Sequence, residues 1–343
     1  MPNKEIILSI VIIVRNEQER IEKCLTCIIE QIDPQCMEVV LVDGDSTDNT
    51  LEIIEKFERI TPYIQVIRCN RYGYSYQRNV GKNCAKGKYI LYISGDTIAS
   101  KGMLKKYMNV IHNYKYDVIQ GTIINVSDNS KFGSYMKCIY PIFYKNVVGN
   151  MAHDVSTVNI CIKRDLLEKY SFDERISSME DKEWFVRLCV KEKDIKFRRL
   201  QSACIYHIVH ENFWEYYKKI FREARALEKI NKAYKKDYDT NFFNWIKYAS
   251  CVMRMGILIC LTMMILLICQ QGKYSMVLFG LTFLVKSIYI ILHYFRNKKC
   301  NFMYTLLISI YLNAVFWGYT SSKIERGLIK NKLFFRKEEQ RKI

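Results

Sequence analysis

Acidic residues are scarce in this sequence relative to basic ones. Its 343 residues include 35 Asp and Glu against 53 Lys and Arg, a formal net charge of +18. Such a surplus indicates an anionic partner, either nucleic acid or membrane headgroups. We expect no nucleic-acid binding, because no base-reading element or stacking platform of a recognisable module is present. The basic residues gather instead at 217–236 and on both sides of the last apolar stretch, which favours membrane lipid as the partner.

A second pair of closely spaced cysteines is lacking too. Although the chain has 13 cysteines, they are spread along its length and many lie inside apolar runs, so we expect reduced, buried side chains. Cys24 and Cys27 lie close together on a helical pattern, but no second pair follows to complete a zinc site. Neither a disulfide framework nor a cysteine-bound metal is therefore expected.

We also expect no cleavable leader at the N-terminus. The apolar stretch at 6–14 is too short to cross a bilayer, contains Ser9, and has no small-residue cleavage site after it. We interpret it as a buried first strand and expect the N-terminal part of the chain to lie in the cytosol.

Short apolar runs alternate with amphipathic segments from residue 6 to about 200. The pattern predicts strands at 7–14, 37–43, 64–69 and 88–94, with helices at 17–31, 46–60 and 74–87. This alternation is typical of an α/β fold with a mostly parallel sheet covered on both faces. Ligands of such sheets bind beyond the carboxyl ends of the strands. The residues of interest are therefore those that follow the predicted strands, at 15–17, 43–48, 68–71 and 94–97.

Three apolar runs, 249–269, 274–294 and 302–320, each approach the roughly 20 residues that a membrane-spanning helix needs. Arg254 and Lys286 interrupt the first two, and charges inside a membrane usually face the bundle interior or snorkel. We predict C-terminal transmembrane or interfacial helices, with a soluble helical bundle as the alternative. The third run is flanked by basic segments on both sides, so the positive-inside rule favours a hairpin of the first two runs with the third partly interfacial.

The resulting domain prediction has four parts. These are a catalytic domain at 1–225, a basic amphipathic linker at 226–248, membrane-associated helices at 249–322 and a basic tail at 323–343.

Several short motifs carry groups that could do chemistry, and each alone has an ordinary structural explanation. The acids of "VDGDSTDNT" (42–50) could form a turn in which Ser46 or Thr47 caps a helix. Arg78 could be a solvated helix charge, or could bind phosphate. Glu180 and Asp181 would be favoured at a helix N-terminus by the helix dipole alone.

Taken in order, these motifs resemble the nucleotide-binding and catalytic elements of the inverting family 2 glycosyltransferases, which have the GT-A fold. The resemblance covers about residues 6–225. The matching elements are Asn16-Glu17, the Asp-rich turn with Asp43, Arg78-Asn79, Ala85-Lys86-Gly87, Ser94-Gly95-Asp96 in place of the family's Asp-x-Asp, Phe172-Asp173-Glu174, and Glu180-Asp181.

The resemblance implies that a sugar moves from a nucleotide diphosphate sugar to an acceptor hydroxyl with inversion. Asp43 would accept hydrogen bonds from the base and Arg78 would lie near the nucleotide. Asp96 would hold a divalent Mg²⁺ or Mn²⁺, with His207 as an additional ligand. Asp181 would be the general base, and Glu180 its backup or an acceptor-orienting group.

Four further residues, Asn16, Glu17, Ser94 and Gly95, would complete the nucleotide-sugar site. Two departures from the family pattern leave the nucleotide open: Ser94 replaces the first acid of the metal motif, and Gly44-Asp45 reverses the usual order.

The leading functional hypothesis is a membrane-attached glycosyltransferase that works at the cytosolic face of the cell membrane on a lipid-linked acceptor, in the synthesis of surface polysaccharide or glycolipid. A close variant is a polyprenyl-phosphate sugar synthase. A nucleotidyltransferase would normally show a Gly-rich basic signature near the N-terminus, and "VRNEQERIE" has none. A degenerate, non-catalytic membrane scaffold is the alternative that Ser94 supports. The segment 121–158 is expected to shape the acceptor pocket, with a connecting segment that only packs on the sheet as the alternative.

Overall fold

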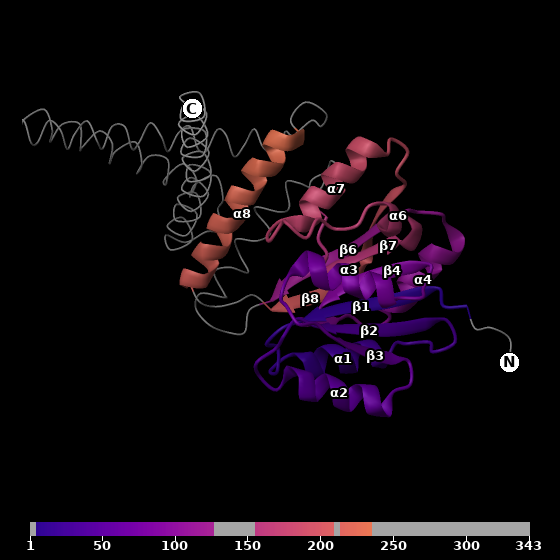
Figure 1. Cartoon of the computed structure of the whole chain (residues 1–343). Coiled ribbons are helices and arrows are strands. Elements are labelled where there is room, and N and C mark those ends of the chain that lie inside the picture. Colours follow the sequence, from indigo (N-terminus) through magenta and orange to yellow (C-terminus); the bar gives the residue numbers. More distant parts are fainter. Residues whose placement is uncertain (1–4, 127–154, 209–212, 235–343) are drawn as a thin grey trace, which may run out of the picture. The chain divides into compact units, whose positions relative to one another are not determined.

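The computed structural model describes residues 5–126, 155–208 and 213–234. The chain divides into two compact units, Met1–His210 and Glu211–Ile343. The first unit contains an eight-stranded sheet among its described residues (Figure 1). In the second, the described residues form helix α8 (Phe213–Tyr234). The predicted end of the catalytic domain at residue 225 falls inside this helix, so that boundary stays a prediction.

The first four strands and the three helices between them form where the sequence predicts them. They are β1 (Leu8–Val14), α1 (Ile21–Ile29), β2 (Met37–Asp43), α2 (Thr50–Ile60), β3 (Ile64–Arg68), α3 (Tyr74–Cys84) and β4 (Tyr89–Ser94). β1 pairs in parallel with both β2 and β4, and β2 pairs in parallel with β3. The prediction of a mostly parallel α/β sheet is confirmed for this half of the unit.

The second half of the sheet is mixed. Its elements are β5 (Thr97–Ala99), α4 (Met103–Asn113), β6 (Val118–Val126), β7 (Asn159–Lys163), α6 (Arg164–Lys169), α7 (Glu180–Lys191) and β8 (Phe197–Ile208). The strand order is β3-β2-β1-β4-β7-β6-β8-β5. β7 runs antiparallel to β4 and β6, while β8 runs parallel to β6 and antiparallel to β5.

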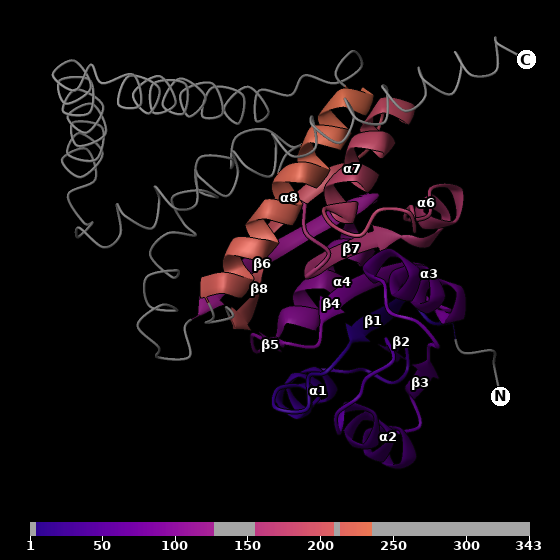
Figure 2. The same cartoon turned by 60° about the vertical axis from the view of Figure 1, so that its left-hand side comes forward.

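Helices cover both faces of the sheet (Figures 1 and 2). Alternate residues of β1 enter different cores: Ile10 and Ile12 pack with α1, α2 and α4, whereas Val11 and Ile13 pack on the side of α3, α6 and α7. A strand buried on both faces must be apolar at nearly every position. This double burial explains why β1 reads as one continuous hydrophobic run.

The carboxyl ends of the first four strands meet at one edge of the sheet. Val14 pairs with Asp43, and Asp43 pairs with Arg68 on its other side. Across β1 from β2, Ile13 pairs with Ser94. This register brings the residues that follow each strand together, as expected for a parallel sheet.

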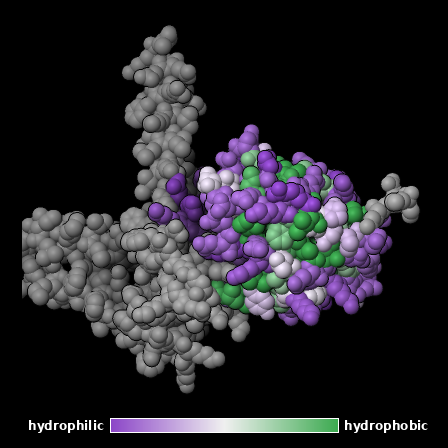
Figure 3. Space-filling model, turned by 90° about the horizontal axis from the view of Figure 1, so that it is seen from below, coloured by the Kyte–Doolittle hydropathy of each residue, from purple (hydrophilic) through white to green (hydrophobic). Residues whose placement is uncertain are grey.

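The predicted membrane segments lie outside the described residues and stay a prediction. Within the part of the chain that the structure describes, no helix is both long enough and apolar enough to cross a membrane. On the face shown in Figure 3, hydrophilic residues cover most of the described surface and hydrophobic residues appear in patches between them.

Candidate active site

Two loops at the strand ends, residues 15–20 and 43–50, are joined by polar contacts; we call them the strand-end loops. The N–H of Asn16 donates to Ser46 Oγ at 3.0 Å, and the N–H of Glu17 donates to Thr50 Oγ1 at 2.7 Å. In return, Thr47 N–H donates to Asn16 Oδ1 at 2.9 Å. Side chains of each loop therefore satisfy backbone groups of the other, which fixes the edge of the sheet beside β1 and β2.

The expected helix cap is replaced by these contacts. Helix α2 begins at Thr50, several residues after Ser46 and Thr47, and has no side-chain cap. The Ser46 hydroxyl accepts from the neighbouring loop, and Asp48 Oδ1 instead accepts from the N–H of Thr50 at 3.0 Å. The prediction of a Ser46 or Thr47 cap was wrong, because both residues form hydrogen bonds with Asn16 of the facing loop.

Asp43 is the last residue of β2 and is only 3% exposed. Its Oδ2 accepts the N–H of Ser46 at 3.0 Å, while its Oδ1 is buried and has no hydrogen-bond partner among the described residues. A buried acceptor without a donor is costly, so this position favours a ligand that brings an N–H or O–H. The arrangement suits the predicted contact with a nucleotide base.

Asp96 and His207 come together from distant parts of the chain. His207 lies on β8 opposite both Thr97 and Asn125, and its Nε2 is 3.1 Å from Asp96 Oδ2. Its Nδ1 is 3.1 Å from Asn125 Oδ1. In the tautomer in which Nδ1 donates to Asn125, the lone pair of Nε2 faces the carboxylate, whereas in the other tautomer Nε2 donates to Asp96. Lone pairs that face each other, as in the first tautomer, need a proton or a cation between them.

This geometry fits a divalent cation. Two ligands at right angles, each about 2.1 Å from Mg²⁺, are about 3.0 Å apart. A ligating histidine usually donates its second nitrogen to a fixed oxygen, as His207 can to Asn125. No group of three His, Cys, Asp or Glu suited to a metal occurs among the described residues.

Glu17 interacts electrostatically with both Asp96 and His207. Burial, and next the negative charge of Asp96, raise the pKa of Glu17 to about 7, while Arg20 and His207 oppose the shift. Arg20 Nη1 contacts Glu17 Oε2 at 3.1 Å. A second carboxyl group close to Asp96 strengthens the preference of this region for a cation.

Gly95 allows the end of β4 to pack against β1. A Cβ at this position would lie 2.6 Å from Cγ1 of Val14. The N–H of Gly95 also donates to the carbonyl of Ile13 at 3.3 Å. We therefore assign Gly95 a packing contact that brings the backbone before Asp96 close to β1.

Arg78 and Glu180 form a buried ion pair. Arg78 Nη1 on α3 contacts Glu180 Oε1, the first residue of α7, at 2.5 Å, and the two side chains are 5% and 8% exposed. Burial raises the pKa of Glu180 and the Arg78 guanidinium opposes that shift. The predicted roles of Arg78 at the nucleotide and of Glu180 as a backup base stay predictions; the contact observed is between the two residues.

Asp181 follows Glu180 in the first turn of α7 and is half-buried. Its Oδ2 accepts the N–H of Thr157 at 3.4 Å. The residue before the helix, Met179, has a left-handed backbone with φ of 60°, and α7 has no side-chain cap. Such strain in a non-glycine residue persists only where surrounding contacts hold it.

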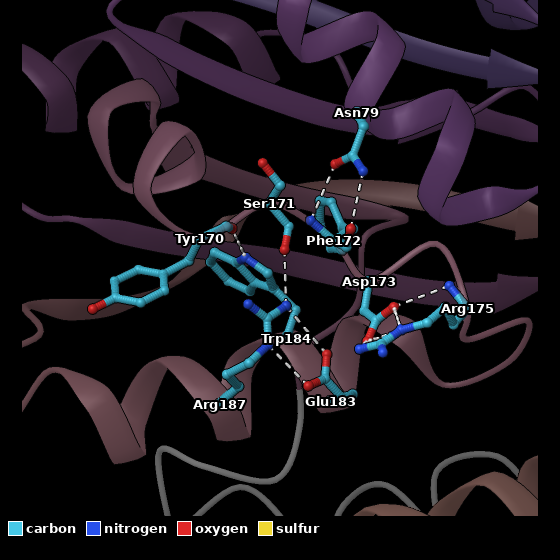
Figure 4. A network of polar contacts seen from close by, with 9 residues as sticks. All are labelled: Asn79, Tyr170, Ser171, Phe172, Asp173, Arg175, Glu183, Trp184 and Arg187. Atoms are coloured by element: carbon cyan, nitrogen blue, oxygen red, sulfur yellow. Dashed lines mark hydrogen bonds and ion pairs between the residues drawn. The ribbon is translucent and has the colours of Figure 1, made fainter.

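A network of polar contacts, drawn in Figure 4, ties the turn at 170–175 to α3 and α7; we call it the α3–α7 network. The Asn79 carboxamide donates to the carbonyl of Phe172 at 2.9 Å and accepts its N–H at 3.1 Å. From α7, Trp184 Nε1 donates to the Tyr170 carbonyl at 2.5 Å, and Arg187 Nη2 donates to the Ser171 carbonyl at 2.8 Å. The network holds α7 against the rest of the unit.

The family model described as "Glycosyl transferase family 2" matches residues 9–171, which include the strand-end loops, Arg78 and Asp96. Residues 9–171 are a family 2 glycosyltransferase domain. The resemblance deduced from the motifs is therefore confirmed at the level of the family.

Named relatives of this glycosyltransferase domain include GlyG of Streptococcus pneumoniae, a glycosyltransferase that is 26% identical over 154 residues. The match covers 43% of this chain and 51% of GlyG, so the chain spans about half the length of that relative.

Two solved structures share the fold. The mannosyltransferase PcManGT from Pyrobaculum calidifontis, in complex with GDP-Man and Mn²⁺, has a TM-score of 0.61 at 14% identity and covers 91% of this chain and 86% of its own. S. aureus TarS 1–349 in complex with UDP has a TM-score of 0.50 at 20% identity and covers 71% and 79%. The likeness supports the GT-A architecture expected for this glycosyltransferase domain.

The structure brings together some of the site residues that the sequence predicts for the glycosyltransferase domain. The structure brings Asp96 to His207 and Arg78 to Glu180, and it places Asp43 at the same sheet edge as Asn16. Most of the segment expected to shape the acceptor pocket, 127–154, lies outside the described residues.

Two residues of the site had no signal in the sequence. Asn125 orients His207, and Gln77 Nε2 donates to the carbonyls of Val14 and Val42 at 3.0 and 3.1 Å. Both act across strands or helices far apart in sequence, and no local pattern encodes that.

Proposed function

We propose that the chain is an inverting glycosyltransferase that moves a sugar from a nucleotide diphosphate sugar to an acceptor hydroxyl. The observation that carries this proposal is the convergence of Asp96 Oδ2 and His207 Nε2, 3.1 Å apart, at the edge of the sheet where the parallel strands end. That edge is where open α/β sheets bind nucleotides. The family of the domain and the nucleotide complexes named for its structural neighbours support the same donor class.

Asp96 and His207 would hold a divalent Mg²⁺ or Mn²⁺ beside the donor diphosphate. When bound, such a cation neutralises charge that develops on the leaving nucleotide. Asn125 would keep the His207 ring oriented through Nδ1. Ser94 and Gly95, which precede Asp96, would line the same part of the donor site.

The strand-end loops would bind the nucleoside. Asp43 Oδ1, buried and without a partner among the described residues, would accept a donor group of the base. The loop that carries Asn16 and Glu17 lies directly beside it, held by the contacts to Ser46 and Thr50. UDP and GDP-Man are named for structural neighbours, so the test below compares donors with different bases.

Asp181 would be the general base. Its carboxylate is only half-buried, so it can reach an acceptor, and it stands at the N-terminus of α7. It would take the proton of the acceptor hydroxyl as the oxygen attacks the anomeric carbon from the side opposite the leaving diphosphate. This geometry inverts the configuration at that carbon.

The acceptor is proposed to be lipid-linked and presented at the cytosolic face of the membrane, as in the synthesis of surface polysaccharide or glycolipid. Three apolar runs at 249–269, 274–294 and 302–320 support attachment. On α8, the basic residues Lys218, Arg222, Arg225, Lys229 and Lys232 recur at helical spacing, and four of them are exposed. A basic stripe of this kind attracts anionic headgroups.

The test is nucleotide release by the detergent-solubilised full chain from UDP-, GDP- and dTDP-sugars with Mn²⁺. Asp96→Ala and Asp181→Asn should each lower release from the accepted donor at least about 100-fold. Asp165→Asn is the matched control, because Asp165 is an exposed acid on α6 whose change should leave release unaltered. Excess chelator should abolish release from the wild type, and re-added Mn²⁺ should restore it.

Three outcomes would contradict parts of this proposal. Release that survives in excess chelator would remove the metal role of Asp96 and His207. No release from any donor, even with a membrane lipid extract, would favour a non-catalytic scaffold. Transfer to a polyprenyl phosphate in place of a hydroxyl acceptor would identify the chain as a polyprenyl-phosphate sugar synthase.

A further inference from the structure

The ion pair between Arg78 and Glu180 joins residues that are 102 positions apart, and both side chains are almost completely buried. Such pairs contribute little net stability, because the cost of removing two charges from water offsets most of their attraction. Removal of one partner is nevertheless costly, since the other charge remains buried. Stability alone therefore does not explain why this pair is present.

The location of Glu180 gives the pair a specific effect. Glu180 is the first residue of α7 and is covalently next to Asp181. The start of this helix has no side-chain cap, and Met179 before it is held in a left-handed conformation. Local sequence therefore does little to fix the first turn, and Arg78 supplies a contact from another helix that does.

Arg78 is itself held rigidly. The Tyr92 hydroxyl donates to its carbonyl at 3.2 Å, and the rings of Tyr74 and Phe172 lie 5.6 and 5.8 Å from the guanidinium carbon. The carboxamide of the next residue, Asn79, forms hydrogen bonds with both the carbonyl and the N–H of Phe172. An anchor of this kind transmits little motion from α3 to α7.

We propose that Arg78 is a positioning residue, which sets the location of Asp181 through its ion pair with Glu180. This role rests on the proposed function, in which Asp181 is the general base. It differs from the role expected from the sequence, a contact with the nucleotide. The two roles predict changes in different kinetic parameters. Loss of a positioning residue lowers kcat, whereas loss of a nucleotide contact weakens donor affinity.

The experiment compares variants of the full chain in nucleotide release from the donor that the wild type accepts. Arg78→Met and Glu180→Gln should lower kcat about 10- to 100-fold, because small displacements of a base have effects of this size. KM for the donor and Kd for the nucleoside diphosphate should stay within about twofold of wild type. Arg78→Lys should recover part of kcat, because a single contact through Nη1 needs mainly a charge.

Two further variants separate positioning from folding. Arg78→Met with Glu180→Leu replaces the pair by apolar side chains, which usually preserves stability; it should fold as wild type and still show the low kcat. Lys82→Met is the comparison variant, because it removes a buried cation one turn further along α3 that donates to Ser171 Oγ at 2.9 Å, beside the α3–α7 network. It should lower kcat less than Arg78→Met does.

The inference is overturned if Arg78→Met weakens nucleotide binding tenfold while kcat is retained, or if the folded double variant turns over at the wild-type rate. Equal losses of kcat in Lys82→Met would also overturn it, since they would indicate a general effect of α3. Absence of release by the wild type itself would instead contradict the proposed function, and the positioning role would fall with it.

Discussion

The strand-end loops and the α3–α7 network hold their residues in contrasting ways. Contacts between the loops join residues 30 to 33 positions apart, and several are exposed to solvent. Contacts of the network join residues up to 93 positions apart and include buried pairs such as the one between Asn79 and Phe172. Water competes for exposed hydrogen bonds but not for buried ones, so the same type of contact stabilises the two regions to different degrees.

The difference matches the tasks proposed for the two regions. Loops that receive a nucleotide benefit from contacts that can be exchanged for ligand contacts at low cost. A helix that carries a base benefits from contacts that keep its location fixed. The comparison leads to three predictions about stability.

The largest effect is expected for Asn79→Ala in the network. The change leaves the N–H and carbonyl of Phe172 buried without their partners and should lower the free energy of unfolding by about 2–4 kcal/mol. Urea unfolding of the full chain in detergent would measure it. Asn83→Ala, the same change at an exposed position on α3, is the control and should cost under about 1 kcal/mol. Equal costs at the two positions would contradict a special role for the network.

A smaller effect is expected for Asn16 in the loops. Its left-handed backbone, with φ of 54°, suits asparagine and glycine, whereas alanine is strained there. Asn16→Ala should therefore be about 1 kcal/mol more destabilising than Asn16→Gly in the same unfolding measurement. Both variants lose the contact of Asn16 Oδ1 with Thr47, so equal stabilities would contradict the expected backbone strain.

The smallest effect is expected for Asp173, at the edge of the α3–α7 network, and it concerns the dependence of stability on pH. The ion pair with Arg175 holds the pKa of Asp173 at about 2, below its usual 3.8. Since the folded chain binds this proton more weakly than the unfolded chain, the contribution of Asp173 is present above about pH 4 and is lost as pH falls toward 2. The pair is exposed, so the amount is under about 1 kcal/mol. Asp173→Asn should flatten this part of the acid-unfolding curve, and an unchanged curve would exclude the pair as a contributor.

The sequence predicted the parallel half of the sheet because local patterns encode it. β1 and β4 are apolar at almost every position, and the helices between them are amphipathic. The family resemblance also pointed to Asp96 and His207, which do meet. The partners Asn125 and Glu180 could not be foreseen from spacing, because the pairing of β8 with β6 and the contact of α3 with α7 join residues far apart in the sequence. The antiparallel placement of β7 between β4 and β6 likewise depends on non-local pairing.

Successive residues of an α-helix project about 100° apart around its axis. Glu180 and Asp181, neighbours at the start of α7, therefore cannot both face α3. With Glu180 turned to Arg78, helical geometry directs Asp181 to another side of the helix, where Oδ2 accepts the N–H of Thr157. The contact of Glu180 with Arg78 therefore fixes the rotation of α7 about its axis, and this rotation in turn determines the direction in which Asp181 points.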